Sequence, residues 1–175
     1  WLQVRIDIPQ DIPARYARVA PYAREQIGLQ VVKLTVKEVF QLGYGKKVFA
    51  LLNECYQPIF GFSTLSEKQM NTFINKYLRL IDLNLIPVIL NDRQEVVGVA
   101  ITMGSLSMAM QKAGGRLLPM GWYHLLKALK WKREDHAEML LIAVRPDYQG
   151  LGVNAMFFND LIPIYNNYGF KWAET

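Results

Sequence analysis

One apolar run near the C-terminal end of the chain is followed by a glycine loop and a helical pattern. Residues 140–144 are all apolar, which is typical of a strand buried on both faces of a largely parallel sheet. Pro146 ends this strand. After Gly152 the apolar positions recur at helical spacing, and they are Val153, Phe157, Leu161, Ile164 and Tyr168. The pattern therefore predicts a strand, a loop and a helix in that order.

The rest of the chain alternates between helical and strand-like patterns. Thr35 can cap a helix that Gly43 and Gly45 interrupt before a second helical piece. Thr64 or Ser66 can cap the next helix. The other predicted helices cover 12–26, 67–81, 105–113 and 120–130, and the predicted strands cover 2–8, 31–34, 87–90, 96–103 and 171–175. The strands 87–90 and 96–103 flank a polar turn, which predicts a hairpin.

The helix that begins after Gly152 opens onto the glycine loop. Its unpaired N–H groups and positive dipole end can bind an anion, and glycines let a phosphate approach the backbone. A plain turn with no ligand has the same two glycines. Gly150, Gly152 and Ala155 also fit the dinucleotide pattern G-x-G-x-x-A, with Glu174 about 20 residues further on. Residues 145–149 disfavour that pattern, because its first glycine normally follows its strand at once.

A longer segment around the loop carries a more specific resemblance. Residues 144–154 read Val-Arg-Pro-Asp-Tyr-Gln-Gly-Leu-Gly-Val-Asn. This segment resembles the acyl-CoA motif V-x-P-x-Y-Q-x-x-G-x-(G/A) of the GNAT N-acetyltransferase superfamily, with Asn154 in place of the last Gly or Ala. The whole chain is similar to the C-terminal half of a bacterial family in which two GNAT-like halves lie in tandem. The resemblance implies an α/β fold, with a mixed central sheet flanked by helices.

The resemblance also implies the limits of the domain. Residues 1–10 would form a strand at the junction with a preceding GNAT-like domain, and residues 11–175 would form a GNAT-like domain. A fourth helix and closing strands normally follow in a GNAT fold, so the strand at 171–175 is expected to have no following helix and no further partner strand. The chain is therefore expected to be truncated at both ends.

A cosubstrate and its contacts follow from the same resemblance. Acetyl-CoA would lay its pantetheine arm along the backbone of Ile142, Ala143 and Val144. A backbone N–H near Ala143 or Val144 could stabilise the oxyanion. The backbone N–H groups expected to hold the pyrophosphate are those of Gln149, Gly150, Leu151, Gly152, Val153 and Asn154. The expected activity is transfer of an acetyl group from acetyl-CoA to a small-molecule or peptide amine.

An ammonium acceptor must lose a proton before it attacks, so a base would help. Glu138, at the start of the cofactor strand, is the first candidate, because many GNAT enzymes carry a glutamate on that strand. Glu174, on the neighbouring strand, is the second, and either could be an ordinary strand-end charge. A GNAT module that has lost its chemistry and binds only acyl-CoA or a partner domain is the alternative function. A dinucleotide oxidoreductase is the third.

Two other segments have open interpretations. Tyr56, Phe60 and Phe62 could anchor a loop to the core or line an acceptor pocket. The stretch between Gly104 and Asp135 would be an insertion beside the cofactor strand, either as a lid or as packing. The basic residues near its end could contact the adenosine phosphates or form a solvated helix end, and they are Lys127, Lys130, Lys132 and Arg133.

Composition limits the remaining possibilities. The chain has 175 residues, of which 51% are hydrophobic and 20% charged, as in a soluble globular domain. A net charge of +5 suits an anionic cofactor, while no basic block argues for nucleic acid. Cys55 is the only cysteine, which fits a cytoplasmic protein, and no apolar run is long enough for a membrane span. His124 and His136 lack metal-ligand spacing, so no metal is expected.

Overall fold

The computed structural model describes residues 3–77, 81–107, 111 and 134–175. Six strands form one sheet in the order β1-β6-β5-β4-β3-β2. Every neighbouring pair is antiparallel except β5 and β6, so the sheet is mixed. The strands are β1 (Arg5–Asp7), β2 (Gln30–Lys33), β3 (Pro87–Leu90), β4 (Val96–Gly104), β5 (His136–Val144) and β6 (Trp172–Glu174). The implied mixed α/β sheet is confirmed, and the hairpin of β3 and β4 forms as predicted.

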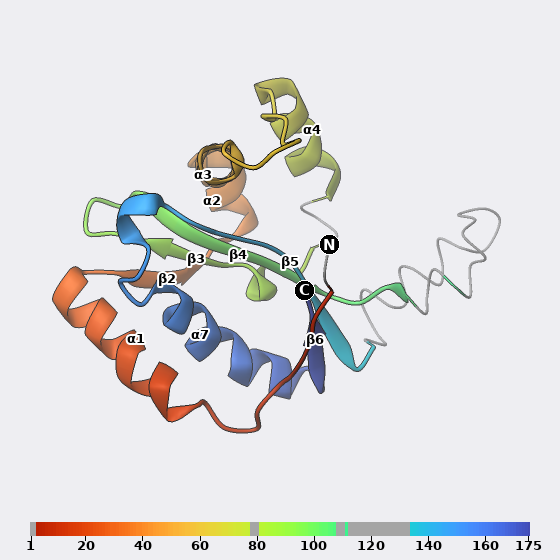
Figure 1. Ribbon diagram of the computed structural model, residues 1–175. Coiled ribbons are helices and arrows are strands. Elements are labelled where there is room, and N and C mark those ends of the chain that lie inside the picture. Colours follow the sequence, from red (N-terminus) through yellow and green to blue (C-terminus); the bar gives the residue numbers. More distant parts are fainter. Residues whose placement is uncertain (1–2, 78–80, 108–110, 112–133) are drawn as a thin grey trace.

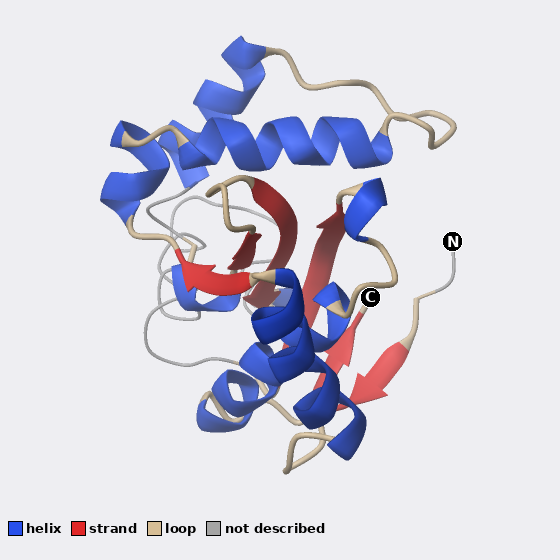
Figure 2. Cartoon of the chain, turned by 90° about the vertical axis from the view of Figure 1, so that its left-hand side faces the viewer, coloured by secondary structure: helices blue, strands red, loops and turns tan. Residues whose placement is uncertain are grey.

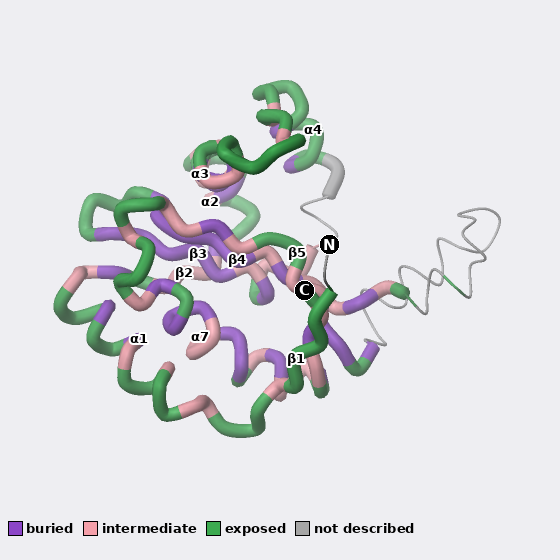
Figure 3. Tube along the Cα trace, viewed as in Figure 1, coloured by how far each residue is buried: buried purple, intermediate pink, exposed green. Residues whose placement is uncertain are grey.

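The prediction of a largely parallel sheet around residues 140–144 is wrong. β5 runs antiparallel to β4 along its whole length and parallel to β6 over only three pairs. Instead, β3 and β4 are buried along most of their length (Figure 3). An apolar run indicates that a strand lies in the middle of a sheet, but it does not indicate whether the neighbouring strands run parallel or antiparallel to it.

Helices cover both faces of the sheet (Figures 1 and 2). On one face lie α1 (Ala14–Ile27) and α7 (Val153–Asn167), and on the other lie α2 (Val36–Gln41), α3 (Tyr44–Tyr56) and α4 (Glu67–Tyr77). Each face has its own apolar cluster, one centred on Phe157 and Leu161 of α7 and one on Leu51 and Leu52 of α3. The short 3₁₀ turns are η1 (Leu83–Leu85) and η2 (Pro146–Tyr148).

Local chemistry explains where the helices on the α3 face begin and end. Thr35 and Glu38 form a capping box at the start of α2, and Gly43, with φ of 72°, separates α2 from α3. Gly45 does not interrupt the helix as predicted, because it lies inside α3. A Cβ there would come within 2.8 Å of side-chain carbons of both Val39 and Ile74, so this glycine allows three helices to pack closely. α4 begins after Ser66, as one of the two predicted caps requires.

The two chain ends lie side by side in the sheet (Figure 1). The expectation that the last strand lacks a further partner is wrong, because β1 pairs antiparallel with β6. Val4 and Thr175 exchange backbone hydrogen bonds at 3.3 and 3.1 Å. α1 also begins differently from the prediction, since Pro13 rather than Asp11 precedes its first turn. The predicted helices between 105 and 130, His124 and the basic residues from Lys127 to Arg133 lie largely outside the described residues.

Candidate functional site

β5 and β6 stay together for only three residue pairs. His136, Ala137 and Glu138 lie opposite Trp172, Ala173 and Glu174. Beyond Glu138, β5 continues to Val144 and pairs with β4 on one side only. Within the described part of the chain, the other edge of residues 139–144 has no strand beside it. We call this edge the free edge of β5.

The backbone polar groups of a strand alternate between its two edges. Arg145 N–H donates to the carbonyl of Val97 in the β3–β4 hairpin at 2.9 Å, so every second residue before Arg145 also faces β4. Ile142 and Val144 therefore present their N–H and C=O groups to the free edge, whereas Ala143 faces β4. Of the three residues expected to pair with a pantetheine arm, only Ile142 and Val144 can do so through the backbone. Ala143 N–H also points toward β4, so it cannot stabilise the oxyanion of a ligand bound at the free edge.

A bulge interrupts β5 at the start of the free edge. Leu141 pairs with Ile101 and Met139 pairs with Thr102, which leaves Leu140 without a partner on β4. Leu140 is 50% exposed and Leu141 37% exposed, although both lie in the middle of a central strand. The free edge therefore begins beside exposed apolar side chains, contrary to the prediction that this run is buried on both faces.

The glycine loop continues directly from the free edge into α7. Gly150 and Gly152 have φ of 78° and 90°, which is the left-handed region that favours glycine. Gly152 is the residue before the helix, and no side chain caps this helix end. The helix starts at Val153, as the sequence pattern predicts.

The N–H groups of this loop are not equally available. Gln149 N–H donates to the Pro146 carbonyl at 3.3 Å, and Leu151 N–H donates to the Tyr148 carbonyl at 3.4 Å. The N–H groups with no acceptor among the described residues are those of Gly150, Gly152, Val153, Asn154 and Ala155. Gln149 and Leu151 already use their backbone N–H donors within the loop. Of the N–H groups expected to bind a phosphate, those of Gly150, Gly152, Val153 and Asn154 therefore remain available.

The two glycines have different surroundings. A Cβ at Gly150 would meet nothing within 4 Å, so this position faces open space. A Cβ at Gly152 would lie 2.7 Å from Cγ1 of Val19 and 3.4 Å from Cβ of Ala23, both on α1. Gly150 therefore leaves room for a ligand, while Gly152 allows α1 to pack against the start of α7.

A polar network holds the loop against the β3–β4 turn. Arg145 donates to both carboxylate oxygens of Asp147, at 2.8 and 3.1 Å, and to Glu95 at 3.3 Å. Asn91 Nδ2 lies 3.1 Å from the Tyr148 hydroxyl, and the guanidinium of Arg145 lies 4.7 Å from the centre of the Tyr148 ring. This network is not visible in the sequence, because Asn91 and Glu95 lie about fifty residues upstream of the loop.

The charges in this network stabilise one another. Hydrogen bonds from Arg145 lower the pKa of Asp147 below its usual range. The pKa of Glu95 is also lowered, first by the hydrogen bond from Asn91 and then by that from Arg145. The pKa of Arg145 is raised, chiefly by its bond to Asp147. Arg145, Asp147 and Glu95 are therefore charged at neutral pH and hold the loop electrostatically.

Two side chains of α3 reach the free edge of β5. The Tyr56 hydroxyl donates to the Ile142 carbonyl at 3.0 Å, and the Cys55 thiol lies 3.4 Å from the Val144 carbonyl. Burial raises the pKa of both groups, so both are protonated at neutral pH. The Tyr56 ring lies 5.8 Å from that of Phe62, while Phe60 is fully exposed. Sequence reasoning singled out these aromatic residues but did not place Tyr56 at the strand edge.

The two candidate bases lie side by side where β5 and β6 separate. Glu138 and Glu174 are direct partners in the parallel register, so both side chains project from the same face of the sheet. Their neighbours Ala137 and Ala173 are buried in the cluster under α7, so the glutamates lie on the opposite face. Both glutamates are half-buried. The structure therefore places Glu138 and Glu174 on neighbouring strands, on one face, at the start of the free edge.

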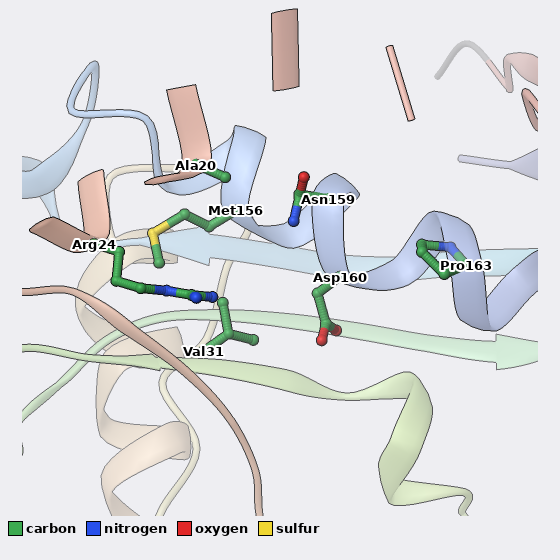
Figure 4. A pocket seen from close by; sticks show the side chains of 7 residues that line it. All are labelled: Ala20, Arg24, Val31, Met156, Asn159, Asp160 and Pro163. Carbon is green, nitrogen blue, oxygen red and sulfur yellow. The ribbon is translucent and has the colours of Figure 1, made fainter. Parts of the chain in front are cut away.

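A separate concavity of about 320 Å³ lies between α1, α7 and β2 (Figure 4). Arg24 and Asp160 line it from opposite sides, and Asp160 forms an ion pair with Lys33 of β2. Burial lowers the pKa of Lys33 despite that pairing. The other lining residues are Ala20, Val31, Met156, Asn159 and Pro163. This concavity lies on the α1 side of the sheet, away from the carbonyls that Tyr56 and Cys55 contact.

The described residues contain neither a cluster that could hold a metal ion nor a helix that could span a membrane. There, no group of three His, Cys, Asp or Glu side chains is placed to hold a metal ion. His136 stacks on Trp172 with ring centres 3.9 Å apart and lies 3.4 Å from the Asp135 carboxylate. In the same residues, each helix is too short or too polar to cross a bilayer.

Comparison with known proteins identifies the fold. No protein family model matches the chain. A GCN5-related N-acetyltransferase from Sphaerobacter thermophilus superposes on 98% of the chain with a TM-score of 0.56 and 12% sequence identity. The chain has the GNAT fold. The C-terminal DUF2156 domain of a candidate lysylphosphatidylglycerol synthetase from Agrobacterium fabrum covers 99% of the chain, with a TM-score of 0.58 and 9% identity.

One curated protein shares detectable sequence similarity with this GNAT-fold chain. A bacterial ceramide synthase from Caulobacter vibrioides is 28% identical over 99 residues, which are 57% of this chain. The match covers 26% of that protein, and the chain spans 40% and 45% of the two solved structures. The chain therefore corresponds to less than half the length of each of these proteins.

The GNAT fold excludes the doubly wound sheet that a dinucleotide fingerprint requires. That fingerprint belongs to a parallel sheet with helices on both faces. Among the described strands only β5 and β6 are parallel, and Glu174 lies beside Glu138 rather than next to Gly150 and Gly152. The Gly-x-Gly loop of this chain therefore follows a strand in a different architecture.

Proposed function

We propose that this chain is the acyl-CoA-binding part of an N-acyltransferase that moves an acetyl group from acetyl-CoA to an amine. The free edge of β5 leads directly into the open N-terminus of α7, and this continuity is the observation that carries the proposal. An extended arm with amide groups would pair with Ile142 and Val144 as an added strand. A pyrophosphate would then reach the free N–H groups of Gly150, Gly152, Val153 and Asn154.

The neighbouring carboxylates suit the proton transfer of such a reaction. The acceptor nitrogen, as the free amine, attacks the thioester carbonyl, the carbon–sulfur bond breaks, and CoA leaves as the thiolate. The nitrogen gives up a proton to the base, and the thiolate takes one up to become the CoA thiol. Glu138 and Glu174 lie together where the free edge begins, so either could take that proton directly or through water. We assign Glu138 as the first candidate because it belongs to the strand that holds the arm.

Glu138→Gln tests this assignment in the full-length protein. We expect kcat/KM to fall by about 100-fold, the usual contribution of a general base, with the largest loss at low pH, where more of the acceptor is protonated. Acetyl-CoA affinity should stay nearly unchanged, because the residue precedes the free edge. Glu174→Gln is the matched variant. A pH–rate profile that Glu138→Gln leaves unaltered would pass the role to Glu174 or to water.

A longer acyl group is a second candidate for the donor. The curated relative is named a ceramide synthase, and a ceramide is a fatty-acid amide of a long-chain amino alcohol. In this chain Leu140 and Leu141 are exposed beside the start of the free edge, which offers apolar surface near the expected thioester. Comparing acetyl-, octanoyl- and palmitoyl-CoA as donors separates the two candidates, since only the second favours the longer chains.

The activity of the whole protein is part of the proposal, because the chain spans less than half the length of each relative. We propose a preceding GNAT-like domain as its partner, and no nucleic-acid or membrane partner. A module that binds acyl-CoA without reacting is the alternative. The open N–H groups of the glycine loop support binding in either case, so they do not distinguish this module from an enzyme.

Calorimetry on the full-length protein with acetyl-CoA, CoA and NADH tests the proposal. We expect acetyl-CoA and CoA to bind and NADH not to bind. Turnover of acetyl-CoA with a panel of amines then separates an enzyme from a binding module. Absence of binding by both acetyl-CoA and CoA would contradict the proposed function.

A further inference from the structure

The free edge of β5 is closed by side chains of the protein itself. Its two outward carbonyls, those of Ile142 and Val144, receive three donors. Tyr56 Oη lies 3.0 Å from Ile142 O, while Cys55 Sγ and Gln149 Nε2 lie 3.4 and 3.1 Å from Val144 O. A ligand that adds to this edge as a strand needs some of the same acceptors. The donors and the ligand therefore compete for one set of backbone oxygens.

Tyr56 is the donor that matters most among the three. A thiol is a weak donor, and Gln149 belongs to the glycine loop itself. The phenol of Tyr56 is a strong donor, and its ring adds bulk beside Ile142. Its pKa is raised by burial, so it keeps its proton over the neutral pH range. An amide of an incoming arm must come to about 3 Å from the same oxygen, where it meets the Tyr56 hydroxyl.

Tyr56 lies at the margin of the apolar cluster on the α3 face and is not one of its fully buried residues. It is the last residue of the helix and packs, half-buried, against the margin of the apolar cluster that buries Leu51 and Leu52. The segment that follows is largely exposed, with Ile59 52% exposed and Phe60 fully exposed. A change of the Tyr56 side chain therefore affects the end of the helix and an exposed loop.

We propose that Tyr56 is a positioning residue that closes the free edge of β5 and is displaced by the acyl-CoA arm, so that it sets the affinity for the donor. This inference rests on the proposed function of the free edge. Tyr56 forms no bond to the reacting atoms. It acts through the Ile142 carbonyl, which it holds until the arm replaces it.

Tyr56→Phe in the full-length protein is the test, with CoA and acetyl-CoA as probes in calorimetry. The variant keeps the ring and removes the competing hydrogen bond. A hydrogen bond of this kind changes an equilibrium by a factor of about 2 to 10. We expect CoA to bind about 2- to 10-fold more tightly, KM for acetyl-CoA to fall by the same factor, and kcat to stay unchanged. A merely structural residue would not lower KM alone.

Tyr44→Phe is the matched control. Tyr44 is the first residue of the same helix, three turns away, and Lys47 Nζ lies 4.5 Å from its ring centre. We expect no change in CoA affinity for this variant. Tyr56→Leu is a second test variant that also lacks the donor, in case Tyr56→Phe is poorly folded.

The outcomes separate this inference from the function on which it rests. If the natural protein does not bind CoA, the proposed function fails. If the natural protein binds CoA and Tyr56→Phe binds it equally or more weakly, the positioning role is overturned and the function stands. A fall in kcat at unchanged KM would also overturn it, because Tyr56 would then take part in the chemistry.

Discussion

The two ends of α7 are both flanked by glycine, yet they differ in what their backbone groups contact. Gly150 and Gly169 have nearly the same φ, 78° and 77°, and a Cβ at either would meet nothing within 4 Å. At the C-terminal end the backbone groups are hydrogen-bonded within the chain, since Gly169 N–H donates to Asn166 O and Phe170 N–H donates to Tyr165 O. At the N-terminal end the first-turn N–H groups have no acceptor among the described residues.

The difference shows that a glycine's own conformation does not mark a binding site. Phe170 is 2% exposed and packs edge-on against Tyr165, so the C-terminal end is closed by a buried apolar contact. The N-terminal end follows a strand edge and a loop held outward by Arg145. The unpaired N–H groups and the positive dipole end therefore favour an anion at the end that leads on from β5.

Gly152→Val should have the largest effect of the variants at these ends, and the effect should be on stability. The new Cβ would lie 2.7 Å from Val19 Cγ1, and a β-branched residue at φ of 90° is strained. We expect a loss of about 3 kcal/mol in the free energy of unfolding, measured by urea denaturation. A variant as stable as the natural protein would contradict the packing of α1 against Gly152.

Gly150→Asp should weaken CoA binding by about tenfold or more. Asp tolerates the left-handed conformation, the position is open, and its carboxylate would repel the pyrophosphate at the free N–H groups. Gly169→Asp is the matched control at the other end of α7, and it should leave CoA affinity unchanged. It should also destabilise the protein more than Gly150→Asp, because an anion is unfavourable at a helix C-terminus. Calorimetry and thermal melting of both variants check these expectations, and equal CoA affinities would remove the phosphate assignment.

Arg145→Ala should have the smallest effect, and its size should depend on pH. The variant loses the exposed pairs with Asp147 and Glu95, so we expect Tm to fall by about 2 °C at pH 7. Folding lowers the pKa of both carboxylates, so their contribution is present above the unfolded pKa of about 4 and is lost as the pH falls through the lowered values. The difference in Tm should therefore stay constant from pH 5 to pH 8 and shrink below pH 4. A difference that persists at pH 2.5 would show that lost packing, not charge, is the cause.

Much of the site could be predicted from local sequence because its parts are local. The strand, the turn at Pro146, the glycines and the start of α7 at Val153 are contiguous, and their signals are apolar spacing and turn residues. The motif in residues 144–154 also indicated the GNAT fold that the solved structures share. The capped helices after Thr35 and Ser66 were predictable for the same reason, since a cap and its partner lie three residues apart.

Only the tertiary structure decided which groups of those local elements are free. The direction of β5 against its neighbours follows from strand order, and that order places Ala143 toward β4 and Ile142 and Val144 toward the free edge. Tyr56 reaches Ile142 across 86 residues of sequence. Such contacts depend on which faces of the helices and strands pack together. A periodic sequence pattern indicates only that a face is apolar, not which face it packs against. The sequence alone therefore determined where an open helix N-terminus follows a glycine loop, while long-range packing determined which backbone groups remain available to a ligand.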